Sequence, residues 1–140
     1  MARGFSQKEG IDYEKAFALV ERYTSIITIM ELASMMKWDL DQMDVKTSFL
    51  NGVIEEVVCI EQPQGFELED RATHICKLKK ALYGLKQAPR VWYGGIYIFL
   101  TSMGFTKSKV DPNIYMKIMD DEPVILLLYV DDLFLTINEK

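Results

Sequence analysis

The most apolar part of the chain lies near its end and is interrupted by two acidic residues. Within Val124–Ile137, two apolar runs flank the pair Asp131–Asp132. The runs are short and are bounded by the turn-forming segments Asp120–Pro123 and Asn138–Lys140, a pattern typical of β-strands. The pattern therefore predicts a β-hairpin with the two aspartates at its tip.

An earlier segment has the three-and-four spacing of an amphipathic helix. Thr24 is the expected N-cap, and the helix runs for about three turns. Its apolar positions, which we expect to face the core, are Ile26, Ile29, Met30, Ala33 and Met36.

A second helix is predicted from about Ala88 to Met103. Pro89 suits its first turn, and Gly104 suits its C-terminal stop. Gly94–Gly95 lies inside it at a cost of about 1 kcal/mol per glycine relative to alanine. The expected buried face consists of Val91, Trp92, Ile96, Phe99 and Leu100.

The remaining segments predict short strands and turns. Strands are expected at Trp38–Val45, Glu55–Glu61 and His74–Leu78, with a turn or short helical segment over Lys46–Gly52. We find no internal repeat and no linker. Strands that alternate irregularly with two helices predict one mixed α+β domain over residues 1–140.

Length and hydropathy narrow the class of protein. A chain of 140 residues is long enough to bury a core. No segment approaches the ~20 apolar residues that a membrane helix needs, and the first ten residues lack the hydrophobic core of a signal peptide. We therefore expect an intracellular protein that is neither secreted nor bound to a membrane.

The net charge of −5 conceals a segregated distribution of charge. Between Arg71 and Val110 there is no acidic residue, so the rest of the chain carries every Asp and Glu. The basic residues of this strip are Arg71, Lys77, Lys79, Lys80, Lys86, Arg90, Lys107 and Lys109. Such a strip can hold phosphates, or it can be a solvated face.

Three aspartates supply the candidate chemistry. Asp44 closes a predicted strand, and Asp131 and Asp132 lie at the predicted hairpin tip. Carboxylates that hold a pair of divalent ions are the usual device of nucleotidyl transfer, and Mg²⁺ suits such oxygen ligands. The residues alone leave two interpretations of the tip open, an ordinary turn and a metal site. With one histidine and no GxxxxGK[ST] loop, the sequence favours neither a Ser-His-Asp hydrolase nor a P-loop nucleotidase.

Five blocks of sequence, in order, resemble the reverse transcriptase domain of copia-type LTR retrotransposon polyproteins. The resemblance covers nearly the whole chain, and its blocks are Arg3–Tyr13, Met43–Gly52, Glu61–Glu67, Leu78–Arg90 and Tyr129–Asp132, the last reading Tyr-Val-Asp-Asp. It implies a reverse transcriptase-like fold of partial fingers and palm, the palm being a ferredoxin-like antiparallel sheet packed on helices.

The resemblance also implies roles for single residues. Asp44, Asp131 and Asp132 match the catalytic, metal-binding aspartates. Asp44 and Asp131 are expected to bind two Mg²⁺ ions, with Mn²⁺ as an alternative, and Asp132 is more peripheral. Tyr83, Gly84 and Lys86 match the segment that contacts the nucleotide and template.

Two further residues carry alternatives. Phe49 is expected either to crowd the 2′ position of the incoming sugar or simply to pack in the core. Arg90 is interpreted as a helix-surface arginine, with a phosphate contact as the alternative.

The implied reaction is RNA-directed DNA polymerisation by two-metal transfer to a primer 3′-hydroxyl. The implied partners are an RNA template, a DNA primer, deoxynucleoside triphosphates and the remainder of a Pol polyprotein, without a membrane. The implied location is a cytoplasmic virus-like particle or the nucleus.

The resemblance implies a chain without the upstream fingers segment, the thumb and RNase H, and one in which Gly94–Gly95 stands where the family has larger polar helix residues. We therefore expect the isolated chain to be inactive as a polymerase. The alternative is a non-enzymatic remnant or a domesticated nucleic-acid-binding module.

Overall fold

The computed structural model describes residues 4–16, 23–68 and 74–138. The chain divides into two compact units, each described here by itself. Unit 1 comprises residues 1–17 and 49–95, and unit 2 comprises residues 18–48 and 96–140. Two α-helices and an antiparallel sheet confirm the predicted α+β class. No helix in the described ranges has both the length and the apolar character needed to cross a bilayer.

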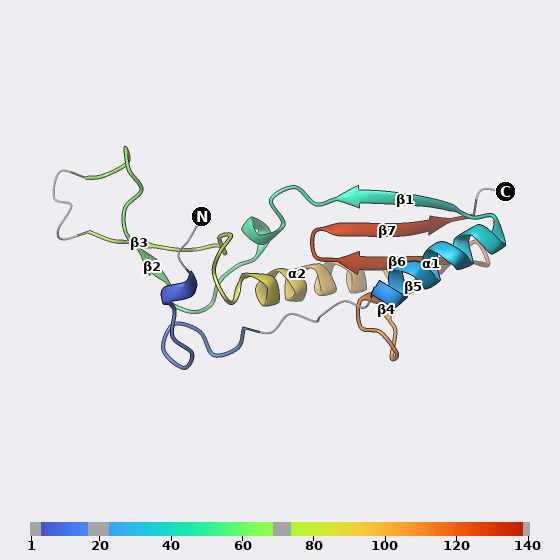
Figure 1. Cartoon of the computed structure of the whole chain (residues 1–140), viewed down its shortest axis with the longest axis horizontal. Coiled ribbons are helices and arrows are strands. Elements are labelled where there is room, and N and C mark those ends of the chain that lie inside the picture. Colours follow the sequence, from blue (N-terminus) through green and yellow to red (C-terminus); the bar gives the residue numbers. More distant parts are fainter. Residues whose placement is uncertain (1–3, 17–22, 69–73, 139–140) are drawn as a thin grey trace. The chain divides into compact units, whose positions relative to one another are not determined.

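Unit 2 is built on a five-stranded sheet in which every neighbouring pair is antiparallel (Figure 1). The order β1-β7-β6-β5-β4 is a meander of the last four strands with β1 added at the β7 edge. The strands are β1 (Asp39–Asp44), β4 (Thr106–Lys107), β5 (Ile114–Met119), β6 (Glu122–Tyr129) and β7 (Asp132–Ile137). The predicted strand at 38–45 is thus confirmed to within one residue at each end.

The predicted apolar hairpin is confirmed as β6 and β7. Leu126, Leu127 and Leu128 are all almost completely buried. Because successive strand residues point to opposite faces, β6 is covered on both faces of the sheet. Central burial of this kind explains why the strand is a continuous apolar run.

The tip of this hairpin differs from the prediction by one residue. Tyr129 pairs with Asp132, so the two-residue loop is Val130–Asp131 and Asp132 already belongs to β7. Val130 has a φ of 51°, an uncommon conformation for a β-branched residue. Pairing with β1 accounts for the shift, because Asp132 is also the partner of Asp44.

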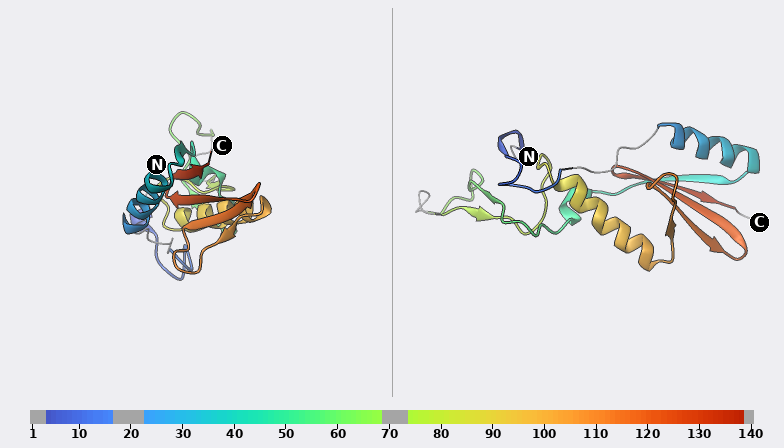
Figure 2. Two further views of the ribbon diagram at one scale, coloured as in Figure 1. Left: turned by 90° about the vertical axis from the view of Figure 1, so that its right-hand side faces the viewer. Right: turned by 90° about the horizontal axis from the view of Figure 1, so that it is seen from below.

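Helix α1 (Tyr23–Met36) confirms the first predicted helix and lies against one face of the sheet (Figure 2). Thr24 is within its first turn, so the N-cap assignment was wrong. Ile29 and Ala33 are buried, whereas Met30 and Met36 are exposed. The buried stripe is narrower than predicted because a single sheet face covers the helix.

Unit 1 contains less regular structure than the sequence suggested. The candidate strands at 55–61 and 74–78 shorten to a two-residue ladder, β2 (Cys59–Ile60) with β3 (Cys76–Lys77). Short 3₁₀ helices occur at η1 (Gly4–Ser6), in unit 1, and at η2 (Ser48–Asn51), whose first residue belongs to unit 2. The latter confirms the short helical segment predicted before Gly52.

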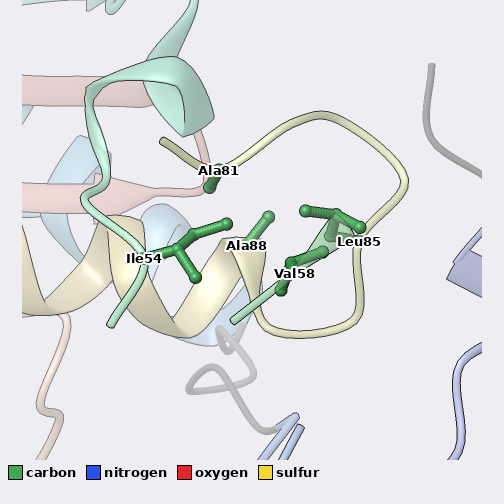
Figure 3. Close-up of a cluster of buried hydrophobic side chains, with 5 residues drawn as sticks. All are labelled: Ile54, Val58, Ala81, Leu85 and Ala88. Carbon is green, nitrogen blue, oxygen red and sulfur yellow. The ribbon is translucent and has the colours of Figure 1, made fainter. Parts of the chain in front are cut away.

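The core of unit 1 is a small apolar cluster. Figure 3 shows its members, which come from the segment after η2, the segment before α2 and the first turn of α2: Ile54, Val58, Ala81, Leu85 and Ala88. Phe49, Leu78 and Leu82 pack against it. These contacts join segments that are about thirty residues apart in the sequence.

Helix α2 (Ala88–Ser102) confirms the second predicted helix. Trp92, Ile96 and Leu100 are buried at four-residue spacing, whereas Phe99 is exposed, contrary to the prediction. Gly104 has a φ of 86° and follows the helix as expected for a C-terminal stop.

Candidate functional site

Two of the predicted site carboxylates face each other across the sheet of unit 2. The β1–β7 register pairs Asp44 directly with Asp132, and Figure 1 shows the end of β1 beside the turn between β6 and β7. Directly opposed residues of an antiparallel pair project from the same face, with Cβ atoms roughly 4.5–5.5 Å apart. Like charges in this position repel, so a cation between them would stabilise the pair.

Asp131 is tied to the segment that follows Asp44. Its carbonyl oxygen accepts a hydrogen bond from the Val45 amide at 2.8 Å. Its carboxylate Oδ1 accepts one from the Ser48 hydroxyl at 2.5 Å. The chain after β1 thus holds the hairpin tip through both backbone and side chain, so all three aspartates lie at one end of the β1–β7 pair.

Asp132 has a hydrogen-bond partner that was not predicted from the sequence. The Gln42 amide nitrogen donates to Asp132 Oδ1 at 3.1 Å. Gln42 precedes Asp44 by two residues, and alternate strand residues share a face. Strand alternation could therefore have placed Gln42 beside the site, whereas no sequence signal singled out Ser48.

The chemistry of these side chains fits Mg²⁺, which takes oxygen ligands and often binds through one or two carboxylates plus water and substrate phosphates. Asp44 is exposed, and Asp131 and Asp132 are half-buried, which leaves the site accessible to solvent. Within the described residues, no three His, Cys, Asp or Glu side chains form a cluster that could hold a metal by themselves. The fit therefore rests on the donor chemistry and on the opposed pair.

Unit 1 contains the other predicted contact residues, beginning with two aromatic side chains. The rings of Phe49 and Tyr83 lie 4.7 Å apart between centroids, at an interplanar angle of 44°. Because Phe49 also packs against the apolar cluster, its ring is held from two directions. The structure thus contains the packing contact that the sequence offered as one interpretation of Phe49.

The loop of Tyr83, Gly84 and Lys86 is held by the N-terminal segment. Gly84 has a φ of 97°, and its carbonyl oxygen would lie 1.7 Å from a Cβ placed on Gly4. The Lys86 amide donates to Gln7 Oε1 at 2.8 Å. These contacts cross about eighty residues of sequence and were not predicted.

A buried glutamine completes this attachment. Gln7 donates through Nε2 to Gln87 Oε1 at 3.0 Å, and Gln87, which has no exposed surface, donates to the Asp12 carbonyl at 3.4 Å. Both Gln7 and Gln87 were missed as candidate positioning residues.

The basic strip is divided between exposed and engaged side chains. Lys77, Lys79, Lys80 and Lys86 are exposed. Arg90 forms an ion pair with Glu56 at 2.9 Å, and Lys107 lies over the Tyr97 ring at 4.8 Å from its centroid. Arg71 lies outside the described residues. Lys107 and Lys109 are exposed as well, so the exposed lysines of the strip occur in both units.

Comparison with protein families gives one description for the whole chain. Residues 1–140 match the family described as "Reverse transcriptase (RNA-dependent DNA polymerase)". No solved structure is significantly similar to the chain.

The curated relatives are transposon polyproteins. The chain is 45% identical over 141 residues to the retrovirus-related Pol polyprotein from transposon TNT 1-94 of Nicotiana tabacum, covering 100% of the chain and 11% of that protein. It is 40% identical over 139 residues to the corresponding polyprotein from transposon RE1 of Arabidopsis thaliana, covering 99% of the chain and 10% of that protein.

A yeast relative matches over a shorter stretch. The putative transposon Ty5-1 protein YCL074W of Saccharomyces cerevisiae is 37% identical over 91 residues, covering 65% of the chain and 30% of that protein. The chain thus spans about a tenth of the length of the plant relatives.

Proposed function

Because the chain belongs to the reverse transcriptase (RNA-dependent DNA polymerase) family, we propose that it is the polymerase domain, in part, of a copia-type Pol polyprotein. Its activity would be RNA-directed DNA synthesis. Unit 2 would be the palm, with a ferredoxin-like sheet, and unit 1 would be part of the fingers. Both would belong to one reverse transcriptase domain over residues 1–140.

The observation that carries the proposal is the pairing of Asp44 with Asp132 in the β1–β7 register, with Asp131 in the adjoining turn. Asp44 and Asp131 would hold two Mg²⁺ ions, or Mn²⁺ in their place, and Asp132 would be peripheral. When bound, such ions activate the attacking oxygen and neutralise the charge of the leaving group.

The protein's own contribution would be positioning. Gln42 holds the Asp132 carboxylate and Ser48 holds that of Asp131, so the donor oxygens are oriented before a primer end and a nucleotide arrive. Orientation of reacting groups is a major source of rate enhancement in a transfer with no covalent enzyme intermediate.

Unit 1 would contact the nucleotide and the template. Support comes from the Phe49–Tyr83 ring contact, which fixes an aromatic edge that could exclude a sugar 2′-hydroxyl and so favour deoxynucleotides. Gly84 and Lys86 would contact the nucleotide and template from the same loop. Arg90 is engaged by Glu56, so we assign it to the support of α2, and a phosphate contact would require that ion pair to open.

The partners would be an RNA template, a DNA primer and deoxynucleoside triphosphates. The exposed side chains that favour backbone binding are Lys77, Lys79, Lys80 and Lys86. As part of a Pol polyprotein, the domain would work in a cytoplasmic virus-like particle or in the nucleus.

A transplant tests this function. The chain replaces its 45%-identical counterpart in the Nicotiana tabacum polyprotein, and the chimaera is assayed for primer extension on an RNA template with Mg²⁺. Extension that is lost in the Asp44→Asn and Asp131→Asn chimaeras supports the proposal.

The control is Asp41→Asn, on the same strand but opposite Leu135, which should leave extension unchanged. A soluble chimaera that does not extend a primer, or one in which Asp131→Asn has no effect, contradicts the assignment. The nucleic-acid-binding module remains the second candidate, since the exposed lysines would also serve binding without catalysis.

A further inference from the structure

Ser48 is a buried polar residue beside the candidate metal site. Its side chain has no exposed surface, and it begins η2, four residues after Asp44. The hydroxyl oxygen lies 2.5 Å from Asp131 Oδ1. A buried hydroxyl needs a partner, and here the partner is a carboxylate, which gives the stronger, charge-assisted form of the bond.

The local backbone is shaped to deliver this hydroxyl. Thr47 has a φ of 55°, in the left-handed region that non-glycine residues rarely occupy. This turn redirects the chain after β1 and places Ser48 against the hairpin. Strained backbone of this kind persists where surrounding contacts enforce it, and the Val45–Asp131 backbone bond of 2.8 Å is one such contact.

The two bonds act on different parts of Asp131. The Val45 amide fixes the backbone of the turn, whereas Ser48 fixes the direction of the carboxylate by occupying one lone pair of Oδ1. Another ligand would bind through the second oxygen, Oδ2. Asp132 is restrained in a similar way by Gln42 at 3.1 Å.

We propose that Ser48 is a positioning residue for Asp131, which orients the carboxylate to bind a divalent cation. The inference rests on the proposed function, because it assigns Asp131 as a ligand. Partners that orient a metal ligand typically change metal affinity by about 10–100-fold when they are removed.

The test uses the full chain and Mn²⁺ alone, with free Mn²⁺ followed by electron paramagnetic resonance. Ser48→Ala should weaken Mn²⁺ affinity about 10-fold or more, and Asp131→Asn should weaken it at least as much. Adding Ser48→Ala to Asp131→Asn should cause no further loss, because Ser48 would act only through that carboxylate.

Two further variants separate orientation from structural support. Ser48→Cys keeps a side chain of similar size but donates only a weak S–H bond, so its affinity should fall between those of the wild type and Ser48→Ala. Ser102→Ala removes a hydroxyl that donates to the Phe99 carbonyl oxygen at 2.6 Å and should leave affinity unchanged. Thermal unfolding of each variant identifies the temperature range in which all are folded.

The outcomes separate the positioning role of Ser48 from the proposed role of Asp131 as a metal ligand. The positioning role is overturned, and the metal site stands, if Asp131→Asn weakens Mn²⁺ binding but Ser48→Ala binds Mn²⁺ like the wild type. If Ser48→Ala does not fold, Ser48→Cys takes its place in this comparison. If Asp131→Asn leaves the affinity unchanged, Asp131 is not a ligand and both proposals fail.

Discussion

Replacing Asp44 with asparagine should stabilise the metal-free protein. Asp44 and Asp132 are opposed across the β1–β7 ladder, and two unit charges roughly 5 Å apart in water repel by about 0.8 kcal/mol. At an ionic strength of about 0.01 M the screening length is roughly 30 Å, so most of this repulsion remains. Asp44→Asn removes it, and a gain of about 0.8 kcal/mol corresponds to a rise in Tm of about 2–4 °C for a chain of this size.

The assay is thermal unfolding at low salt with a chelator present. The matched control is Asp41→Asn, which removes a carboxylate from the same strand but faces Leu135 instead of an acid. Its Tm should change less than that of Asp44→Asn. Raising the salt to about 1 M, where the screening length is roughly 3 Å, should remove most of the difference.

Added Mg²⁺ should reverse the order of stability. A cation that binds only the folded state at ten times its Kd stabilises it by about 1.4 kcal/mol, and Asp44→Asn would lack one of the two carboxylates, Asp44 and Asp131, that are proposed to bind it. If Asp44→Asn lowers Tm at low salt, or if both proteins gain equally from Mg²⁺, the carboxylates do not form the proposed site.

Three sets of substitutions test other parts of the structure. Gly94 and Gly95 lie inside α2, and nothing lies within 4 Å of a Cβ added to either residue. Gly94→Ala and Gly95→Ala should therefore each raise the free energy of unfolding, measured by urea titration, by about 0.5–1 kcal/mol. A lower free energy of unfolding in either variant would contradict the helix geometry. Gln7→Ala removes the acceptor of the Lys86 amide, so hydrogen exchange at that amide should accelerate. Exchange at the Leu128 amide in unit 2 should not change. Unchanged protection at Lys86 would refute the proposal that Gln7 holds the loop of Lys86. Three exposed lysines can be neutralised together: Lys79, Lys80 and Lys86. This change should reduce the slope of the logarithm of the binding constant for an RNA–DNA hybrid against the logarithm of salt concentration by about 2–3. An unchanged slope would exclude these lysines from the binding surface.

Local patterns were sufficient to predict the main elements of the fold. The apolar runs predicted β6 and β7, and the three-and-four spacing predicted α2, because each pattern lies within a short stretch of sequence. The observed bounds of these elements agree closely with the predicted ones. The Asp44 end of β1 was also predicted to within a residue.

Features set by pairing between distant segments were missed. The hairpin tip shifted to Val130–Asp131 because β1 pairs with β7, ninety residues along the chain. The length of the two-residue ladder of β2 and β3 was also not predicted from the sequence, because it depends on how the surrounding segments pack.

In the candidate site, too, local patterns revealed some residues, whereas residues positioned by distant contacts were missed. Asp44, Asp131 and Asp132 were found because acidic residues beside apolar strands are conspicuous and because the order of motifs resembles one family. Ser48 and Gln42 were not found because their roles appear only when the turn after β1 meets the hairpin. Gln7 and Gln87 were missed for the same reason, since about eighty residues separate them.

Asp44 and Asp131 are proposed to bind a divalent cation together, and anomalous diffraction from crystals soaked in Mn²⁺ locates the bound ion. A manganese peak is expected within coordination distance of carboxylate oxygens of both residues, with Asp132 nearby. A peak confined to the acidic turn at Asp120–Glu122, with none at Asp44 and Asp131, would contradict it.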